Sequence, residues 1–334
     1  MNPGPADQAP DQGKLGRRLG LGVFLGLVIY AAFALWGDLE SLGDALVDLD
    51  PVAVVAALGL SLANYLVRFV RWERYRGLLG VRLDRTTSFL IHLAGLALTV
   101  TPGKMGEAFK SWLIREVDGS PISRTAPIVV AERFTDLIGF LVLVAVGGLA
   151  TAPEFAWVFW ATLAACAVSL VLLGSPAVGE GACSLLSRLP VVGGLAPKVR
   201  AALESTRVLL AWRELPGAIL LATFGWALEC TGFWLVASSL VEGGLPWLFC
   251  VFTFALSAVA GAVLIFAPGG LGITEGTMTG LLRGRYLAAG MAEEVARARA
   301  VSATLVIRLC TLWFAMGVGL VALSAFRRRR RRAS

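Results

Sequence analysis

Charged residues within otherwise apolar segments are the part of this sequence best suited to chemistry. A charge near the centre of a lipid bilayer costs at least about 2.5 kcal/mol, so such a residue is usually paired or functional. The residues of this kind are Lys104, Glu107, Lys110, Glu132, Arg133, Asp136, Glu275 and Arg308. The cations could bind a lipid phosphate, and the carboxylates could orient the cations or bind a polar headgroup. The set is therefore predicted to bind a lipid headgroup.

An alternative role for the same residues is to form internal ion pairs, with Arg133 and Glu107 as a natural pair. Glu229, alone in an apolar segment, and His92, the single histidine, are interpreted as satisfied polar residues. One histidine excludes a histidine-rich zinc site, and the five cysteines contain no CxxC pair. We therefore expect no metal, no cofactor and no catalytic residue.

Two segments that contain proline and glycine lie beside these charges, TPGKMGE and APGGLG. Proline removes a backbone donor and glycine permits a positive φ, so both segments are expected to break helices within the membrane. Half-helices that begin near Met105 and Ile273 would each present about half a positive charge, which suits a phosphate. The alternative is that these segments mark loops at the membrane surface. The predicted break residues are Pro102, Gly103, Gly106, Pro268, Gly269, Gly270 and Gly272.

The elements that must position these residues are membrane helices. The 334 residues are 57% hydrophobic and 16% charged, whereas soluble proteins contain about 25% charged residues. Because a span needs about 20 apolar residues, six spans are predicted at 19–37, 51–67, 137–153 (extended back through 127), 155–179, 215–241 and 309–326. The fold is predicted to be an all-α polytopic membrane protein, with six full spans plus two re-entrant helical hairpins at 86–115 and 245–282. Eight full spans fit equally well.

The distribution of arginine predicts the orientation of these spans. The arginines between Arg68 and Arg85 and the six from Arg327 to Arg332 are expected to be cytoplasmic, and the acidic loop 38–50 to be outside. Both termini are therefore predicted to be cytoplasmic. Arg68, Arg71 and Trp72 are interpreted as interfacial lipid contacts. Because the terminal arginines account for most of the net charge of +7, a nucleic-acid-binding face is excluded.

The two hairpins belong to a predicted internal repeat. Pro51 opens a span 51 residues before Pro102, and Pro216 opens a span 52 residues before Pro268. The repeat units cover about 51–150 and 216–326 within a single domain, 19–326, which lies between a disordered cytoplasmic lead, 1–18, and a basic tail, 327–334. The loop charges give the two units opposite orientations, an arrangement typical of secondary transporters.

The order of four motifs resembles a known family. RFVRWERYRGLLG, TPGKMGEAFKSWLIR, ERFTDLIGF and APGGLGITEGTMTGLL follow one another as in the membrane domain of lysylphosphatidylglycerol synthases, a flippase-like family, over about residues 19–323. The resemblance implies a bacterial or archaeal inner-membrane protein that moves a lipid between leaflets. The family pattern falls on Arg71, Trp72, Pro102, Gly103, Gly106, Glu107, Glu132, Arg133, Asp136, Gly269, Gly270, Gly272 and Glu275. No segment has the length and polarity of the soluble aminoacyl-transfer domain, so synthase activity is not expected.

The function predicted from the sequence is a lipid flippase or transporter for a phospholipid or a polyprenyl-linked lipid. One alternative is a membrane-embedded transferase that acts on such a lipid, with Glu132 or Asp136 as the base. A non-catalytic scaffold of the cell envelope is the other. The expected partner is the lipid itself and not a nucleic acid. A homo-oligomeric state and a separate lipid-modifying enzyme are compatible with the pattern.

Overall fold

The computed structural model describes residues 24, 28, 30–32, 35–36, 39–99, 109–148, 155–187, 195–263 and 270–333. Within these ranges the chain is helical and contains no strand. Most of the predicted span at 19–37 lies outside the described residues. The same is true of Pro102, Gly103, Lys104, Gly106, Glu107, Pro268 and Gly269. The predictions that depend on them therefore remain predictions.

The described helices follow one another along the chain with short connections. They are α2 (Leu39–Val47), α3 (Pro51–Leu78), α4 (Arg85–Ala94), the 3-10 helix η2 (Gly95–Leu98), α5 (Phe109–Asp118), α6 (Ile122–Thr125), α7 (Pro127–Gly148), α8 (Ala156–Gly174), α9 (Pro176–Ser187), α10 (Ala196–Leu209), α11 (Leu215–Ser238), α12 (Trp247–Val263), α13 (Ile273–Ala288), α14 (Glu293–Arg308), the π-helix η7 (Leu309–Trp313) and α15 (Phe314–Ala333). The last three form one continuous helix.

Four of these helical stretches are long and apolar enough to cross a membrane: Pro51–Leu78, Ala156–Gly174, Leu215–Ser238 and Glu293–Arg332. Helix α7 has 22 residues but carries three charged residues in its first half, so it is not among these four. Helix α12 is apolar but shorter. Most predicted spans therefore have a helical counterpart.

The helix ends are stabilised by local features of the sequence. Asp50 caps α3, because its carboxylate accepts a hydrogen bond from the backbone N–H of Val52 at 2.8 Å, and Pro51 occupies the first turn. Asp84 caps α4 in the same way. Gly272, with a φ of 86°, precedes α13, which begins at the predicted Ile273. A helix therefore begins at the predicted position.

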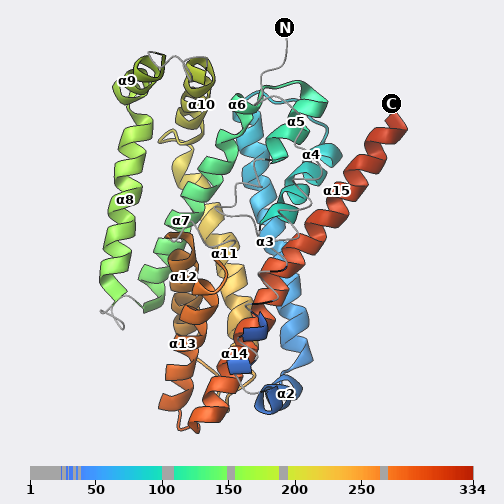
Figure 1. Cartoon of the computed structure of the whole chain (residues 1–334), viewed down its shortest axis with the longest axis vertical. Coiled ribbons are helices and arrows are strands. Elements are labelled where there is room, and N and C mark those ends of the chain that lie inside the picture. Colours follow the sequence, from blue (N-terminus) through green and yellow to red (C-terminus); the bar gives the residue numbers. More distant parts are fainter. Residues whose placement is uncertain are drawn as a thin grey trace.

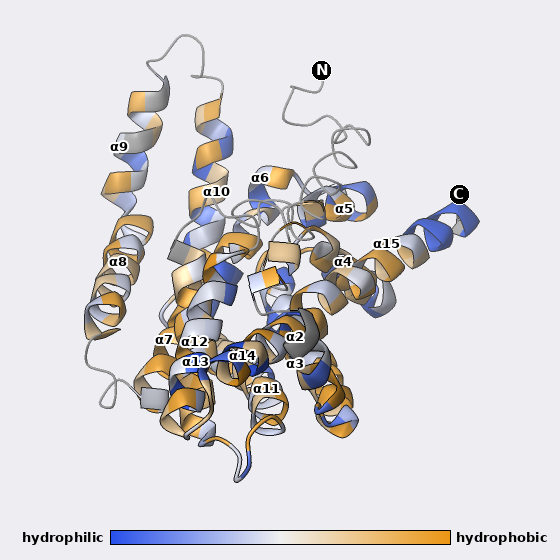
Figure 2. Cartoon of the chain, turned by 60° about the horizontal axis from the view of Figure 1, so that its bottom comes forward, coloured by the Kyte–Doolittle hydropathy of each residue, from blue (hydrophilic) through white to orange (hydrophobic). Residues whose placement is uncertain are grey.

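The bundle has two distinct ends (Figure 1). Helices α4, α5, α6, α9 and α10 lie toward one end, where the C-terminal part of α15 also lies, and α2, α13 and the start of α14 lie toward the other. The C-terminal end of α15 is hydrophilic and projects away from the other helices (Figure 2). The α4–α5 pair and the α12–α13 pair therefore occupy opposite halves of the bundle.

Glycines allow close packing of η2 against α15 and of α12 against the residues that precede α13. Helix α15 crosses η2 at Gly319, where an added Cβ would lie 2.8 Å from the Cα of Ala97. Helices α12 and α13 meet at Gly261 and Gly270, where a Cβ at Gly270 would lie 3.2 Å from the Cα of Gly261. Only glycine permits such a backbone approach. These contacts fix η2 against α15 and the start of α13 against α12.

Candidate functional site

Helix α3 has its polar face buried and its apolar face exposed. Its exposed residues include Val52, Val55, Leu62 and Leu66, which are 45 to 72% exposed. Together with the exposed Gly59 they recur every three or four positions. Its buried face carries Ser61, Asn64, Arg68, Arg71 and Trp72, each at most 7% exposed. A helix of a soluble protein buries its apolar face instead. The arrangement is the one expected of a membrane helix that lines a polar interior.

The predicted role of Arg68, Arg71 and Trp72 as interfacial lipid contacts is therefore wrong for this structure. Helix α3 continues 11 residues beyond the predicted end of the span at Val67, and it carries all three side chains into the bundle. The hydropathy window ended at Arg68 because charges lower the local hydropathy. The carboxylate and aromatic partners that these residues meet inside the protein come from distant parts of the sequence.

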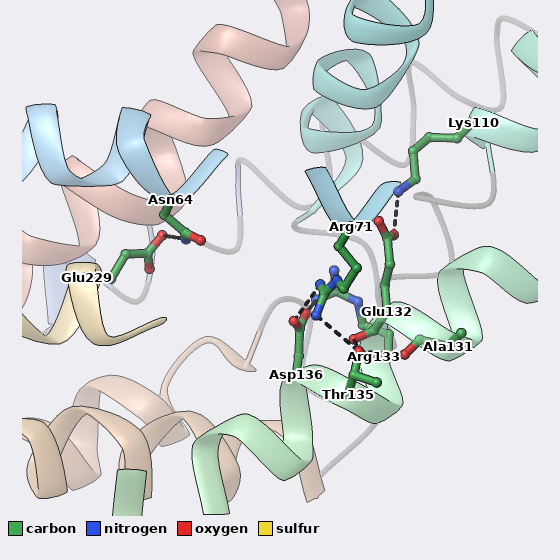
Figure 3. Close-up of polar contacts among 9 residues, drawn as sticks. All are labelled: Asn64, Arg71, Lys110, Ala131, Glu132, Arg133, Thr135, Asp136 and Glu229. Carbon is green, nitrogen blue, oxygen red and sulfur yellow. Dashed lines mark hydrogen bonds and ion pairs between the residues drawn. The ribbon is translucent and has the colours of Figure 1, made fainter. Parts of the chain in front are cut away.

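The first polar contact joins α3 to α7. Arg71 donates a hydrogen bond to Asp136 at 2.7 Å and another to Thr135 at 3.0 Å, and the Arg71 side chain is 1% exposed (Figure 3). Arg133, one turn before Asp136 on α7, lies 3.3 Å from the other carboxylate oxygen. Two guanidinium groups therefore share one buried carboxylate.

The second contact joins α5 to α7. The Nζ atom of Lys110 lies 2.5 Å from Oε2 of Glu132, and both side chains are at most 4% exposed (Figure 3). The same Nζ lies 4.7 Å from the centre of the Trp72 ring, a cation–π contact. The indole N–H of Trp72 donates to Ser88 on α4 at 3.0 Å. The predicted charge cluster is therefore a buried network that joins four helices, α3, α4, α5 and α7.

The third contact lies in the second half of the chain. Arg308, the last residue of α14, donates from Nε to Oε1 of Glu275 at 2.6 Å. The other oxygen of Glu275 accepts the backbone N–H of Gly272 at 2.7 Å, which fixes the start of α13. Asn64 on α3 donates to Glu229 on α11 at 2.5 Å (Figure 3). Both halves of the chain thus contain a buried carboxylate–arginine pair, and the second pair lies beside the start of α13 and the π-helix η7.

A cavity of about 330 Å³ lies between these groups. Its volume is at the lower end of the range of ligand pockets, about 300–1,000 Å³. Its charged lining residues are Arg68, Arg133, Asp136, Glu229 and Arg308. Its polar and small lining residues include Tyr65, Thr99, Gly270, Thr274 and Thr311, and its apolar wall includes Leu137, Phe140, Trp226, Phe254 and Leu312. The cavity is therefore bounded by both η2, at the end of α4, and the start of α13.

The structure brings together a large part of the predicted site. Arg133, Asp136 and Arg308 line the cavity, while Lys110, Glu132 and Glu275 lie behind it in ion pairs. The residues that line the cavity are candidates for the predicted binding role, and the residues behind it are candidates for the alternative role of internal ion pairing. The predicted pair of Arg133 with Glu107 lies outside the described residues. His92 does not line the cavity, and its ring packs 5.6 Å from that of Phe69.

Sequence reasoning missed three residues of this region. Glu229 was interpreted as a satisfied polar residue, and it does accept a hydrogen bond, but it also lines the cavity. Asn64 and Tyr65 were not considered. The signal was present in the spacing of Ser61, Asn64, Arg68 and Arg71, which places polar residues on one face of a predicted span.

Apolar outer faces, long apolar helices and a charged interior define an integral membrane protein. The chain belongs to the family described as lysylphosphatidylglycerol synthase TM region, which matches residues 23–319. The chain is also similar to the "Inner membrane protein YbhN" of Escherichia coli (strain K12), with 22% identity over 274 residues that cover 81% of this chain and 80% of that protein. The family resemblance of the sequence motifs is therefore confirmed.

Proposed function

We propose that the protein is a flippase-like transporter that moves a phospholipid or a polyprenyl-linked lipid between the leaflets of the cell membrane. The observation that carries this proposal is the cavity of about 330 Å³ with five charged lining residues, enclosed by helices whose outer faces are apolar. A lipid could place its headgroup in the cavity while its tails stay in the bilayer. Charges inside a membrane bundle commonly mark such substrate paths.

The arrangement of the broken segments supports the proposal. The α4–α5 and α12–α13 pairs lie in opposite halves of the bundle, as two copies of an inverted repeat at 51–150 and 216–326 would (Figure 1). In secondary transporters the binding site lies where such copies meet, near the middle of the membrane. Rocking of the two halves around a bound headgroup would then expose it to each side in turn. Lys104 and Glu107 belong to the proposed site on sequence grounds.

The membrane and the orientation are also part of the proposal. The arginine-rich end of α15 lies at the same end of the bundle as α9 and α10 (Figure 1). Because positively charged loops stay in the cytoplasm, this end is assigned to the cytoplasmic side, which places the C-terminus there. The similarity to YbhN, an inner membrane protein by name, supports the inner membrane as the location.

The test is translocation of fluorescent lipids by the full chain in liposomes. Arg133→Ala and Glu275→Gln are each expected to lower the rate by about tenfold or more, the size of effect that loss of one charged hydrogen bond produces. Arg74→Ala, which removes an exposed ion pair with Glu214, is the control and should leave the rate unchanged. Unchanged rates for both site variants would contradict the site. Headgroup turnover by the purified protein would instead support a transferase.

A further inference from the structure

The C-terminal end of α15 is a cationic surface. Six consecutive arginines, Arg327 to Arg332, form its last turns, and all six are exposed. Phe326, the residue before them, is 2% exposed and belongs to the core cluster that contains Trp72 and Leu209. The cationic surface therefore begins directly after a core residue of the same helix.

The apolar residues that precede these arginines fix their depth in the membrane. Leu320 and Val321 are 43% and 72% exposed, as expected of side chains that face the lipid acyl chains. Arg327 follows Val321 by six residues, about 9 Å along a helix. The headgroup layer adds roughly 5–7 Å to each side of the hydrocarbon core. The arginines therefore lie at the level of the lipid headgroups.

One face of this helix end contacts the protein. Arg329 lies 3.3 Å from the carboxylate of Asp84, the residue that caps α4. Arg330 donates a hydrogen bond at 3.0 Å to the backbone carbonyl of Glu116 on α5. These two arginines therefore attach the end of α15 to α4 and α5.

Arg328 and Arg332 form the opposite face of the same helix end. They are four residues apart, so they lie on one side of the helix, about 200° around its axis from Arg330. Within the part of the chain that the structure describes, neither forms a hydrogen bond or an ion pair. The helix end projects away from the other helices (Figure 2). Two guanidinium groups, which suit phosphate oxygens, are therefore accessible at the membrane surface.

We propose that Arg328 and Arg332 bind the phosphate groups of anionic phospholipids of the cytoplasmic leaflet, at a surface site separate from the cavity. Lipid phosphates are the anions at this depth, and basic residues next to a membrane helix attract anionic lipids. A zwitterionic headgroup is a poorer ligand, because its cationic group repels the two arginines. Bound headgroups hold one face of the helix end, while α4 and α5 hold the other. The site does not depend on the proposed transport.

The test measures which lipids gather around the end of α15 in liposomes that contain the full chain. A donor fluorophore is attached through Ser334→Cys, and the five native cysteines are buried, so the new thiol is labelled selectively. The acceptors are phosphatidylglycerol and phosphatidylcholine, each labelled on an acyl chain and used at the same mole fraction. Energy transfer should report a local enrichment of phosphatidylglycerol of about fivefold or more, because one arginine near an anionic surface contributes about fivefold. Equal transfer to the two lipids would overturn the proposal.

Two double variants of equal charge test the face of the helix. Arg328→Gln with Arg332→Gln should abolish most of the enrichment, whereas Arg329→Gln with Arg330→Gln should keep it. An equal loss in both variants would show that net charge alone attracts the lipid, and would overturn the site. A short RNA oligonucleotide provides the soluble polyanion. If RNA at the same phosphate concentration displaces phosphatidylglycerol, the face binds a soluble partner and the lipid site is wrong.

Discussion

Glu132→Gln is expected to lower the free energy of unfolding by about 3–5 kcal/mol, the cost of leaving a buried charge without its ion-pair partner. The residue that would lose its partner is Lys110, whose ammonium lies 2.5 Å from the Glu132 carboxylate with both side chains at most 4% exposed. Thermal unfolding of the purified protein in detergent measures the effect. The double variant Lys110→Gln, Glu132→Gln should recover most of the loss, because removing both charges of a buried pair is often nearly neutral.

The control for this prediction is Glu214→Gln at the surface. Arg74 and Glu214 form an ion pair at 2.5 Å, but the Arg74 side chain is 64% exposed. Their hydrogen bonds hold the pKa of Glu214 below its ordinary value. Because water solvates both groups after the change, the unfolding temperature should stay the same. Equal shifts for Glu132→Gln and Glu214→Gln would show that the Lys110–Glu132 pair is not buried as described.

The double variant Glu275→Gln, Arg308→Gln is expected to fold but to lose translocation by about a hundredfold or more. Arg308→Gln alone would leave the Glu275 carboxylate buried without its cation, with a cost of about 3–5 kcal/mol. The double variant removes both charges and so avoids this cost, while it also removes a cation from the wall of the cavity. The expected loss of translocation corresponds to the removal of two charge-assisted contacts, each of which contributes about 1.5–3 kcal/mol. Unfolding temperature and lipid translocation are measured on the same preparation.

A second double variant provides a matched control on the same two helices. Arg283 and Glu293 also join α13 to α14 through an ion pair, but their side chains are 38% and 48% exposed. Changing both to glutamine should alter neither stability nor translocation. If the Glu275–Arg308 variant translocates lipid as fast as this control, the pair has a structural role only.

The helical class and the position of one helix break could be predicted from the sequence. Those predictions depend on local patterns, since the apolar stretch 243–274 is too long for one upright helix and contains a proline followed by glycines. The structure accordingly ends α12 at Val263 and begins α13 at Ile273. The charged residues whose burial in a membrane is energetically unfavourable could also be recognised from the sequence, because this free energy depends mainly on residue type.

The partners of those charges could not be predicted from local patterns. Lys110 binds Glu132 across 22 positions, and Arg71 binds Asp136 across 65, so the pairs form only when the helices pack. The length of α3 was underestimated because the residues that surround Arg68 and Arg71 in the bundle also come from distant parts of the sequence. The charges of these two arginines lower the local hydropathy and so indicate a membrane boundary at Arg68 and Arg71. In the folded protein Arg68 lines the cavity and Arg71 is buried against Asp136.

We propose that a lipid headgroup occupies the cavity between the two halves of the bundle. The most direct measurement uses a phosphatidylglycerol with a photoreactive group on its headgroup, cross-linked to the reconstituted protein and mapped by mass spectrometry. Cross-links are expected at lining residues such as Thr99, Trp226 and Thr311, and they should be reduced in Arg133→Gln. Cross-links confined to the outer face of α3, at Val55 and Leu66, would contradict it.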